Sequence, residues 1–382
     1  MTRITRMGEV NQQPKRILMT ADTVGGVWTY ALELTRALQP YGIEVLLAVM
    51  GPRLSAAQHE DAHSIANLDL FKSDYKLEWM PDCWQDVKRA GKWLLHLENR
   101  LHPDLVHLNG YAHANLPWRS PTLVAGHSCV YSWWHSVHGD TPPPEWQRYK
   151  NEVKNGLDAA DLVVTPSKAM LRALNTHYGS IENARVIPNG RSPEHFKPAV
   201  KQSFILSAGR LWDQAKNINR VAEIACELPW PVYVAGDTKA PQQQTPNHTF
   251  GRHCRSLGSL SEPELREWFA AASIYALPAF YEPFGYTPLE AALSGCALVL
   301  GDIDSLREIW RDAAVFVDPN DSTALKSELL NLTKDDERRR DLSQRARERA
   351  LEFTSARMGE NYLAAYAELL VHSKREELAQ CA

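Results

Sequence analysis

Short runs of apolar and β-branched residues recur along the chain, separated by longer stretches with the spacing of amphipathic helices. Ten runs predict buried strands, at residues 16–20, 44–50, 104–109, 122–127, 161–166, 204–209, 232–237, 274–279, 297–302 and 314–318. Helical spacing lies between many of them, at residues 27–38, 219–228, 262–272 and 287–295. Hydrophobic strands that alternate with helices predict parallel sheets covered on both faces, so the expected fold class is α/β.

The strands form two series of about five, which is too many for one sheet of usual width. Residues 186–199 separate the series and are rich in proline and turn-forming residues. We therefore expect a hinge there, with one Rossmann-like domain over residues 1–190 and a second over residues 191–355. The charged run at residues 334–353 predicts a helix with a solvated face.

The composition argues against several classes of protein. The chain has 382 residues, of which 44% are hydrophobic, and a formal net charge of −4, so no basic face for nucleic acid is expected. The N-terminal segment lacks the apolar core of a signal peptide, and no run is long enough to cross a bilayer, which predicts a cytoplasmic protein. The six cysteines are scattered without a C-x-x-C pair, which favours reduced thiols over disulfides or a zinc site.

Two loops that follow predicted strands could bind an anion. Gly25 and Gly26 follow the first strand and open a helix, so their backbone N–H groups can approach an anionic ligand, although a tight turn explains the same pair. Arg210 follows the strand at 204–209, and Lys216 stands at the start of the next helix, an arrangement that suits a diphosphate. The alternative for both cations is an ion pair with a neighbouring carboxylate.

A third loop, YEPFGYTPLE at residues 281–290, carries two glutamates. Thr287 and Glu290 have the spacing of a capping box, which predicts a helix that begins with Thr287 as its N-cap. Glu282 has no such structural role. A carboxylate beside free amides suits sugar hydroxyls next to a phosphate.

The stretch GDIDSL at residues 301–306 contains an Asp-x-Asp pair, a pattern that holds manganese in some metal-dependent enzymes. Ser305 and Glu308 have the spacing of a second capping box, so we interpret Asp302 and Asp304 as part of a strand-to-helix turn. No metal site is expected in this chain.

Taken together, these motifs resemble the retaining glycosyltransferases of family 4, the group 1 glycosyl transferases. Residues 282–290 resemble the family's E-x7-E signature, residues 21–30 its N-terminal glycine loop, and AGRL (208–211) with Lys216 its donor-phosphate pair. LGSLSEPEL at 257–265 resembles the nucleotide-base loop. EFTSARMGENYLAAY at 352–366 resembles the C-terminal helix that crosses back to the first domain. The resemblance implies the GT-B fold, with two Rossmann-like domains facing across a cleft and residues 356–382 returning to the first.

The family resemblance also implies an activity: metal-independent transfer, with retention, of a sugar from a nucleoside-diphosphate sugar to a hydroxyl of a saccharide or other small acceptor. UDP is the favoured nucleotide and GDP the next, and no cofactor is expected. The implied catalytic residues are Glu282, His127, Arg210 and Lys216. The implied donor-binding residues of the second domain and the glycine loop are Gly25, Gly26, Arg210, Lys216, Leu257, Gly258, Leu260, Glu282, Phe284, Gly285, Tyr286, Thr287 and Glu290.

The acceptor is expected in the first domain, where aromatic side chains are concentrated. Eight of the twelve tryptophans precede the hinge: Trp28, Trp79, Trp84, Trp93, Trp118, Trp133, Trp134 and Trp146. Aromatic faces suit sugar rings, so Trp133 and Trp134 in the segment 127–146, together with His127 and Asp22, are the acceptor candidates. A lipid acceptor reached by peripheral membrane contact is a weaker alternative, based on Arg3, Arg6, Lys15 and Arg16.

Two positions depart from the family pattern. Lys216 lies one residue further from Arg210 than expected, which places its phosphate contact in doubt. Arg191 stands where an apolar residue is usual, and a hinge salt bridge is the expected role.

Three other functions remain to be weighed. A hydrolase or epimerase on the same scaffold cannot be separated by motif, and a non-catalytic sugar-nucleotide-binding partner is a further alternative. A dehydrogenase is disfavoured because G-x-G-x-x-G is missing. The sequence leaves open the sugar, the acceptor and the oligomeric state.

Overall fold

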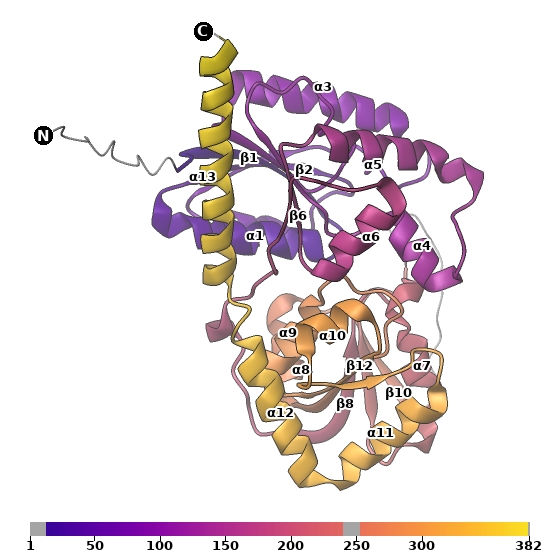
Figure 1. Cartoon of the computed structure of the whole chain (residues 1–382). Coiled ribbons are helices and arrows are strands. Elements are labelled where there is room, and N and C mark those ends of the chain that lie inside the picture. The colour runs from indigo at the N-terminus through magenta and orange to yellow at the C-terminus, as the bar shows by residue number, and fades with distance from the viewer. Residues whose placement is uncertain (1–12, 240–252, 381–382) are drawn as a thin grey trace, which may run out of the picture.

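The chain folds into two α/β lobes, one above the other in Figure 1. The computed structural model describes residues 13–239 and 253–380, with side chains to residue 372. Arg3, Arg6 and Cys381 lie outside the described residues. The five described cysteines are free thiols. None of the described helices combines the length and hydrophobicity that crossing a bilayer requires.

The first lobe is built on a parallel sheet whose strand order is β3-β2-β1-β4-β5-β6-β7 in the described part of the chain. Its strands are β1 (Arg16–Asp22), β2 (Glu44–Met50), β3 (Leu68–Lys72), β4 (Leu105–Leu108), β5 (Thr122–Ala125), β6 (Leu162–Thr165) and β7 (Ala184–Val186). Its helices are α1 (Gly26–Leu38), α2 (Ala56–His63), α3 (Trp84–Leu101), α4 (Val130–His138), α5 (Gln147–Ala159) and α6 (Lys168–Tyr178).

The second lobe repeats this plan, with described strands in the order β10-β9-β8-β11-β12-β13. They are β8 (Gln202–Ala208), β9 (Val232–Ala235), β10 (Cys254–Gly258), β11 (Ala272–Leu277), β12 (Ala297–Gly301) and β13 (Val315–Val317). The helices are α7 (Ile218–Glu223), α8 (Glu262–Ala271), α9 (Tyr286–Leu293), α10 (Asp304–Trp310), α11 (Ser322–Lys334) and α12 (Asp336–Ala350). The two-lobe α/β prediction is confirmed.

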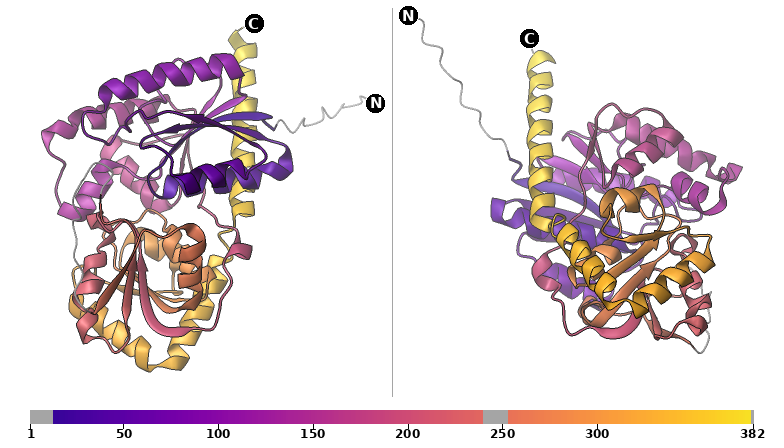
Figure 2. Two further views of the ribbon diagram at one scale, coloured as in Figure 1. Left: turned by 180° about the vertical axis from the view of Figure 1, so that it is seen from behind. Right: turned by 60° about the horizontal axis from the view of Figure 1, so that its bottom comes forward.

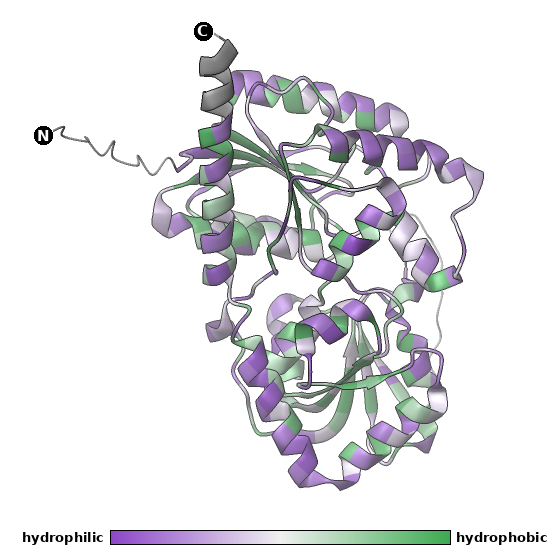
Figure 3. Cartoon of the chain, viewed as in Figure 1, coloured by the Kyte–Doolittle hydropathy of each residue, from purple (hydrophilic) through white to green (hydrophobic). Residues whose placement is uncertain are grey.

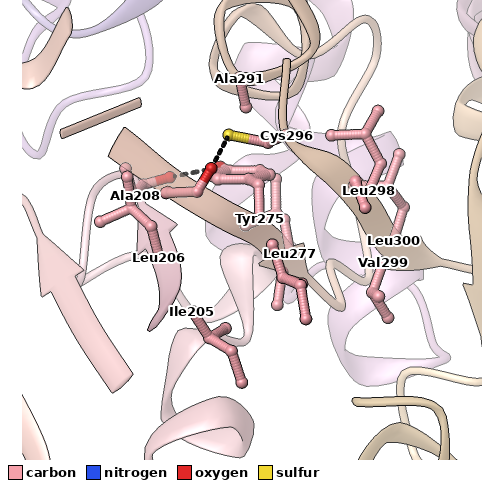
Figure 4. Close-up of a cluster of buried hydrophobic side chains, with 14 of the residues drawn as sticks. Ile205, Leu206, Ala208, Tyr275, Leu277, Ala291, Cys296, Leu298, Val299 and Leu300 are labelled. Carbon is pink, nitrogen blue, oxygen red and sulfur yellow. Dashed lines mark hydrogen bonds between the residues drawn. The ribbon is translucent and has the colours of Figure 1, made fainter. Parts of the chain in front are cut away.

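Each sheet is hydrophobic on both faces because helices cover both, and the strands are the most uniformly hydrophobic elements in Figure 3. In the second lobe, side chains of β8, β11 and β12 fill the core together with Cys296 (Figure 4). The buried Tyr275 hydroxyl donates to the carbonyl of Ala208 at 3.0 Å, so its polar end is satisfied inside this core. Most of α12, by contrast, is hydrophilic, as expected of a solvated charged helix.

The last helix, α13 (Ser355–Gln380), leaves the second lobe and packs along α1 of the first (Figures 1 and 2). Tyr362 and Tyr366 are buried in the first-lobe core. A Cβ atom on Gly359 would lie 2.8 Å from the Cβ of Ala37, so only glycine permits this close approach of the two helices.

Two chain segments connect the lobes and touch each other. Arg191 forms an isolated bridge with Thr354, and a Cβ atom on Gly190 would lie 2.2 Å from the Thr354 carbonyl oxygen. Gly190, within the proline-rich hinge, is therefore required by the close approach of the two crossing segments.

The sheet order places the polar loops at one edge. In each lobe the strand order reverses beside the first strand, between β1 and β4 and between β8 and β11. Ligands of open parallel sheets bind at the carboxyl ends of strands next to such a reversal. The loops after β1 and β5 in the first lobe and after β8 and β11 in the second all contribute to one cavity.

Candidate active site between the lobes

A cavity of about 810 Å³ lies between the two lobes. It is lined by the glycine loop and His127 from the first lobe, and by the loops that carry Arg210 and Glu282 from the second. Its volume is within the range of small-molecule sites. The cavity thus brings together four of the motifs on which the sequence interpretation depends.

The glycine loop lies directly against two side chains of the second lobe. Gly25 has a φ of +78°, and a Cβ atom there would lie 3.1 Å from Nη1 of Arg210. A Cβ atom on Gly26 would lie 3.3 Å from Cδ2 of Tyr286. Because a side chain at these positions would crowd Arg210 or Tyr286, Gly25 keeps the space next to Arg210 open and Gly26 keeps the space next to Tyr286 open.

Arg210 and Lys216 both line the cavity, and both are ion-paired. Arg210 Nη2 lies 2.6 Å from Asp213 Oδ2, and Lys216 Nζ lies 2.5 Å from Glu282 Oε2. Burial alone would raise the pKa of Asp213, but Arg210 and Lys216 hold it below its ordinary value. Lys216 lies one residue further from Arg210 than the family pattern predicts. It ends a short 3₁₀ turn (Gln214–Lys216) that accommodates this extra residue, and Lys216 still lines the cavity.

The loop that carries Glu282 is fixed through its backbone. Ser305 Oγ donates to the Glu282 carbonyl at 2.6 Å, and Ser167 Oγ of the first lobe donates to the Pro283 carbonyl at 2.8 Å. The Glu282 side chain is therefore aimed by a loop held from both lobes. Ser305 and Ser167 were not identified from the sequence as parts of the site.

The capping box predicted for Thr287 and Glu290 is wrong. Helix α9 begins at Tyr286, and its N-cap is Gly285 with a φ of 97°. Thr287 Oγ1 and the Tyr275 hydroxyl form a hydrogen bond at 2.7 Å, so Thr287 makes a core contact instead of a cap. Phe284 packs in the core of the second lobe and also lines the cavity, as do Gly285, Tyr286 and Thr287.

The second predicted capping box, Ser305 with Glu308, is also wrong. Helix α10 has Ile303 at its N-cap, and the Glu308 carboxylate accepts hydrogen bonds from the Lys168 and Ala169 amides at the start of α6, at 2.8 and 2.9 Å. The carboxylate thus joins the lobes at a helix N-terminus that favours negative charge.

The Asp-x-Asp carboxylates are engaged by arginines. Asp302 pairs with Arg307, and Asp304 lies 3.0 Å from Arg172 of the first lobe. No group of three or more His, Cys, Asp or Glu side chains suited to a metal ion occurs among the described residues.

Glu290 contacts a buried arginine that joins the lobes. Arg191 is 1% exposed, and its guanidinium lies 2.9 Å from Glu33 of α1, 2.6 Å from Glu262 of α8 and 2.9 Å from Glu290 of α9. Ser355, at the start of α13, also donates to Glu33. The hinge salt bridge expected for Arg191 is therefore present, and it involves three carboxylates drawn from both lobes.

The carboxylates of this cluster lie close to one another, and Glu290 shows the effect. Burial raises the pKa of Glu290 to about 7, with Glu262 and Glu33 adding to the rise and Arg191 opposing it. Burial would lower the pKa of Arg191, but the three carboxylates raise it above its ordinary value.

His127 follows β5 and lines the cavity as a neutral imidazole. Its Nε2 lies 2.8 Å from Asn109 Oδ1, and Asn109 Nδ2 donates to the Thr20 carbonyl at 2.6 Å. Because the amide is oriented by Thr20, His127 donates from Nε2 and its Nδ1 can accept. Burial lowers the pKa of His127 to about 4. This neutral form orients a ligand better than it accepts a proton at neutral pH.

The tryptophans singled out in the segment 127–146 both line the cavity. Trp133 Nε1 donates to Asp213 Oδ1 of the second lobe at 2.9 Å, and Trp134 Nε1 donates to Asp140 at 2.8 Å. Trp133 therefore contacts the same carboxylate as Arg210. Asp22, at the end of β1, also lines the cavity.

The loop expected to hold the nucleotide base is only partly at the cavity. Leu260 lines it, together with Ser259. Leu257 packs against the core of the second lobe, and the Gly258 carbonyl accepts a hydrogen bond from Gly236 at 2.8 Å. Leu257 and Gly258 lie outside the lining. Glu78, Trp79, Trp146 and Tyr149 line the first-lobe side and were not proposed as site residues.

Two family models match adjacent parts of the chain. Glycosyltransferase Family 4 matches residues 24–195, and Glycosyl transferases group 1 matches residues 191–349. Their junction falls at the hinge that contains Arg191. Each model covers one lobe, and together they span the cavity and its loops.

Curated relatives of similar sequence are also named as glycosyltransferases. An O-antigen chain mannosyltransferase B of Escherichia coli is 27% identical over 56% of this chain, and the match spans 62% of that enzyme's own length. A D-inositol 3-phosphate glycosyltransferase of Streptomyces bingchenggensis is 25% identical over 86% of this chain and 84% of its own length.

Solved structures share the fold over nearly the whole chain. Sucrose-phosphate synthase from Thermosynechococcus elongatus aligns with a TM-score of 0.73 at 18% identity, covering 96% of this chain and 100% of that one. Anabaena HepE in complex with UDP and glucose aligns with a TM-score of 0.72 at 15% identity, covering 93% and 100%. The two-lobed fold, the pair of family models and the named relatives agree: the chain belongs to glycosyltransferase family 4 and has the GT-B fold.

Proposed function

We propose that the protein transfers a sugar, with retention, from a nucleoside-diphosphate sugar to a hydroxyl group of an acceptor. The observation that carries this proposal is the cavity itself, where Arg210, Lys216 and Glu282 of one lobe face the glycine loop and His127 of the other. Cations and bare backbone suit a diphosphate, and carboxylates suit sugar hydroxyls.

In this proposal the diphosphate lies between Arg210 and the start of α9. The amides that open α9 carry the positive end of the helix dipole, and the open space above Gly25 admits phosphate oxygens next to Arg210. Lys216 adds a second cation, while its partner Glu282 accepts hydrogen bonds from the sugar. Both partners of this ion pair then contact the donor on opposite sides of the bond that breaks.

The chemistry proposed for this chain is stabilisation of the leaving group. As the bond to the anomeric carbon breaks, negative charge grows on the phosphate oxygen, and Arg210 and Lys216 are positioned to stabilise it. The acceptor oxygen forms its bond to the anomeric carbon on the face that the phosphate leaves, and the departing phosphate oxygen accepts the acceptor's proton, so the configuration is retained. His127 orients the sugar through its neutral ring.

Glu290 is proposed to accept hydrogen bonds from the ribose. Its ion pair with Arg191 lacks hydrogen-bond geometry at Nε, since that N–H has no hydrogen-bond partner although the two atoms are 2.9 Å apart. The carboxylate is thus held electrostatically, and its oxygens remain able to accept from a ligand.

UDP is the first nucleotide to test, and the support is the fold of HepE, which has been solved with UDP and with UDP-glucose. A mannose donor carried by GDP is the second choice, because two relatives are named mannosyltransferases.

The proposal is tested by calorimetric titration of UDP into the wild-type protein and into Arg210→Ala. Loss of one charge-assisted contact, about 1.5–3 kcal/mol, predicts roughly 10- to 150-fold weaker binding in the variant. The matched control is Arg338→Ala, an arginine of the same lobe that pairs with Glu328 on α11, away from the cavity. Equal affinity in all three proteins, or no binding of UDP or GDP to the wild type, would refute the proposal.

A further inference from the structure

The two halves of the cavity differ in charge. On the first-lobe side the lining contains two carboxylates, and no lysine or arginine of residues 13–190 contributes to it. The lysine and arginine side chains of the lining are Arg210 and Lys216 of the second lobe and Arg191 of the hinge, which is paired with Glu33, Glu262 and Glu290. Six aromatic residues complete the first-lobe wall: Trp79, Tyr111, Trp133, Trp134, Trp146 and Tyr149.

The two carboxylates, Asp22 and Glu78, are held by backbone amides and are without salt-bridge partners within the described chain. Asp22 Oδ1 accepts from the Val24 amide at 2.8 Å. Glu78 accepts from the amides of Tyr111 and Ala112 at 3.1 and 2.7 Å. A carboxylate has about four acceptor positions, so each retains capacity for hydroxyl donors in the cavity.

Asp22 and Glu78 are close enough for the charge of Glu78 to raise the pKa of Asp22. Burial raises the pKa of Asp22 to about 6, with Glu78 adding to the rise and Arg210 opposing it. Burial also raises the pKa of Glu78. A ligand phosphate bound between Asp22 and Glu78 would face both carboxylates in a partly desolvated space, where repulsion between like charges is strong.

Two first-lobe cations that are close in sequence to residues of this wall are engaged elsewhere. Lys76 Nζ donates to the Pro81 carbonyl at 2.9 Å, and the Arg148 guanidinium lies over the ring of Trp84 at 4.7 Å. Neither lines the cavity. A phosphate group on the acceptor would therefore lack a cation of the first lobe.

Resting on the proposed function, we infer that the acceptor is an uncharged saccharide whose hydroxyls bind Asp22 and Glu78 and whose ring packs against the aromatic wall, and that sugar phosphates are excluded. Aromatic faces pack well against the C–H faces of sugar rings, while carboxylates accept from hydroxyls and repel phosphate. The relative named D-inositol 3-phosphate glycosyltransferase has a phosphate in the name of its acceptor, so this chain is expected to differ from it.

The test compares matched pairs of acceptors with the wild-type protein and UDP-glucose, or the donor that binds in its place. The pairs are glucose and glucose 6-phosphate, mannose and mannose 6-phosphate, and myo-inositol and its 3-phosphate, with uncharged aryl glycosides of common hexoses added. Products are identified by mass spectrometry, and kcat/KM is measured for each acceptor used. We expect every acceptor used to be uncharged, or at least tenfold better than its phosphate ester.

The same assay is then run on Glu78→Gln, with Glu60→Gln as the matched control. Glu60 is an exposed glutamate of α2 outside the cavity. Glu78→Gln should raise KM for the uncharged acceptor at least tenfold and reduce the discrimination against the phosphate ester, while Glu60→Gln should change neither more than twofold. A thermal melt of each variant checks that the fold is intact.

Two results would overturn the inference: a phosphate ester used as well as or better than its uncharged partner, or an enzyme that hydrolyses the donor and uses none of the uncharged acceptors. Release of nucleoside diphosphate without acceptor, and its calorimetric binding, test the proposed function separately. If the donor binds and turns over but phosphate esters are preferred, only the inference about the acceptor fails.

Discussion

Replacing Arg191 by methionine should destabilise the protein strongly. The change removes the only guanidinium that contacts both Glu33 and Glu290 in the described chain, and their side chains are 1% and 10% exposed. Breaking a buried pair by removing one partner leaves uncompensated charge and costs about 3–5 kcal/mol. For lobes of this size that predicts a melting temperature lower by roughly 6–20 °C at pH 8.

The loss should depend on pH, and the sign follows from the raised pKa of Glu290. A carboxyl whose folded-state pKa lies above its unfolded value contributes stability that is present at low pH and lost as pH rises through the folded pKa. Glu290 starts at about 7 with Arg191 opposing the rise, so removal of the arginine raises it further. The deficit of Arg191→Met should therefore be largest at pH 8 and shrink toward pH 5.

Thermal and urea unfolding of three proteins provide the assay. The matched control is Arg172→Met, which removes another arginine that joins the lobes, but whose pair with Asp304 is 58% and 81% exposed. That loss should be below about 1 kcal/mol. The double variant Arg191→Met with Glu290→Gln should recover part of the stability. A melting temperature within about 2 °C of wild type at pH 8, or equal losses for Arg191→Met and Arg172→Met, would refute the reasoning.

Three further outcomes follow from the site. Glu282→Ala should abolish transfer while leaving the melting temperature within a few degrees of wild type, since the loop is held through its backbone carbonyl; wild-type turnover would remove the side chain from the site. Gly25→Ala should raise the donor KM, because the added Cβ atom would lie 3.1 Å from Arg210 at a strained φ of +78°; an unchanged KM in steady-state assays would contradict this placement. Activity should survive EDTA. The double variant Asp302→Asn with Asp304→Asn should transfer sugar at the wild-type rate, because both carboxylates are paired with arginines. Loss of activity that manganese restores would instead support a metal site at Asp302 and Asp304.

The central strands were predictable from the sequence because each is buried on both faces and therefore reads as a continuous apolar run. The strands that were missed, β3, β7 and β10, lie at sheet edges. Their residues are mostly half-buried or exposed, so no apolar run marks them. Edge position thus explains why about five strands per lobe were expected and more are present.

Local sequence patterns gave wrong helix caps where a side chain bonds to a residue distant in the sequence. Both predicted capping boxes have suitable residues, but Thr287 bonds to Tyr275, Ser305 bonds to the Glu282 carbonyl, and Glu308 caps α6 in the other lobe. Helix caps contribute about 1 kcal/mol, so tertiary contacts of similar strength can displace them.

The Arg191 cluster could be predicted only in outline. An arginine in place of an apolar residue at the hinge indicates a salt bridge, but its partners come from α1, α8 and α9. Nothing in the spacing of Glu33 and Glu262 links them to residue 191. Glu78 was missed for the same reason, because only the fold brings it beside Asp22.

The central claim is that a nucleoside-diphosphate sugar occupies the cavity between the lobes. The most direct measurement is a crystal structure of the protein with a bound UDP-sugar or GDP-sugar, whichever calorimetry selects. The account predicts diphosphate density against Arg210 and Lys216, with sugar hydroxyls within hydrogen-bond distance of Glu282. Density for the nucleotide outside this cavity, or a diphosphate with neither cation in contact, would contradict it.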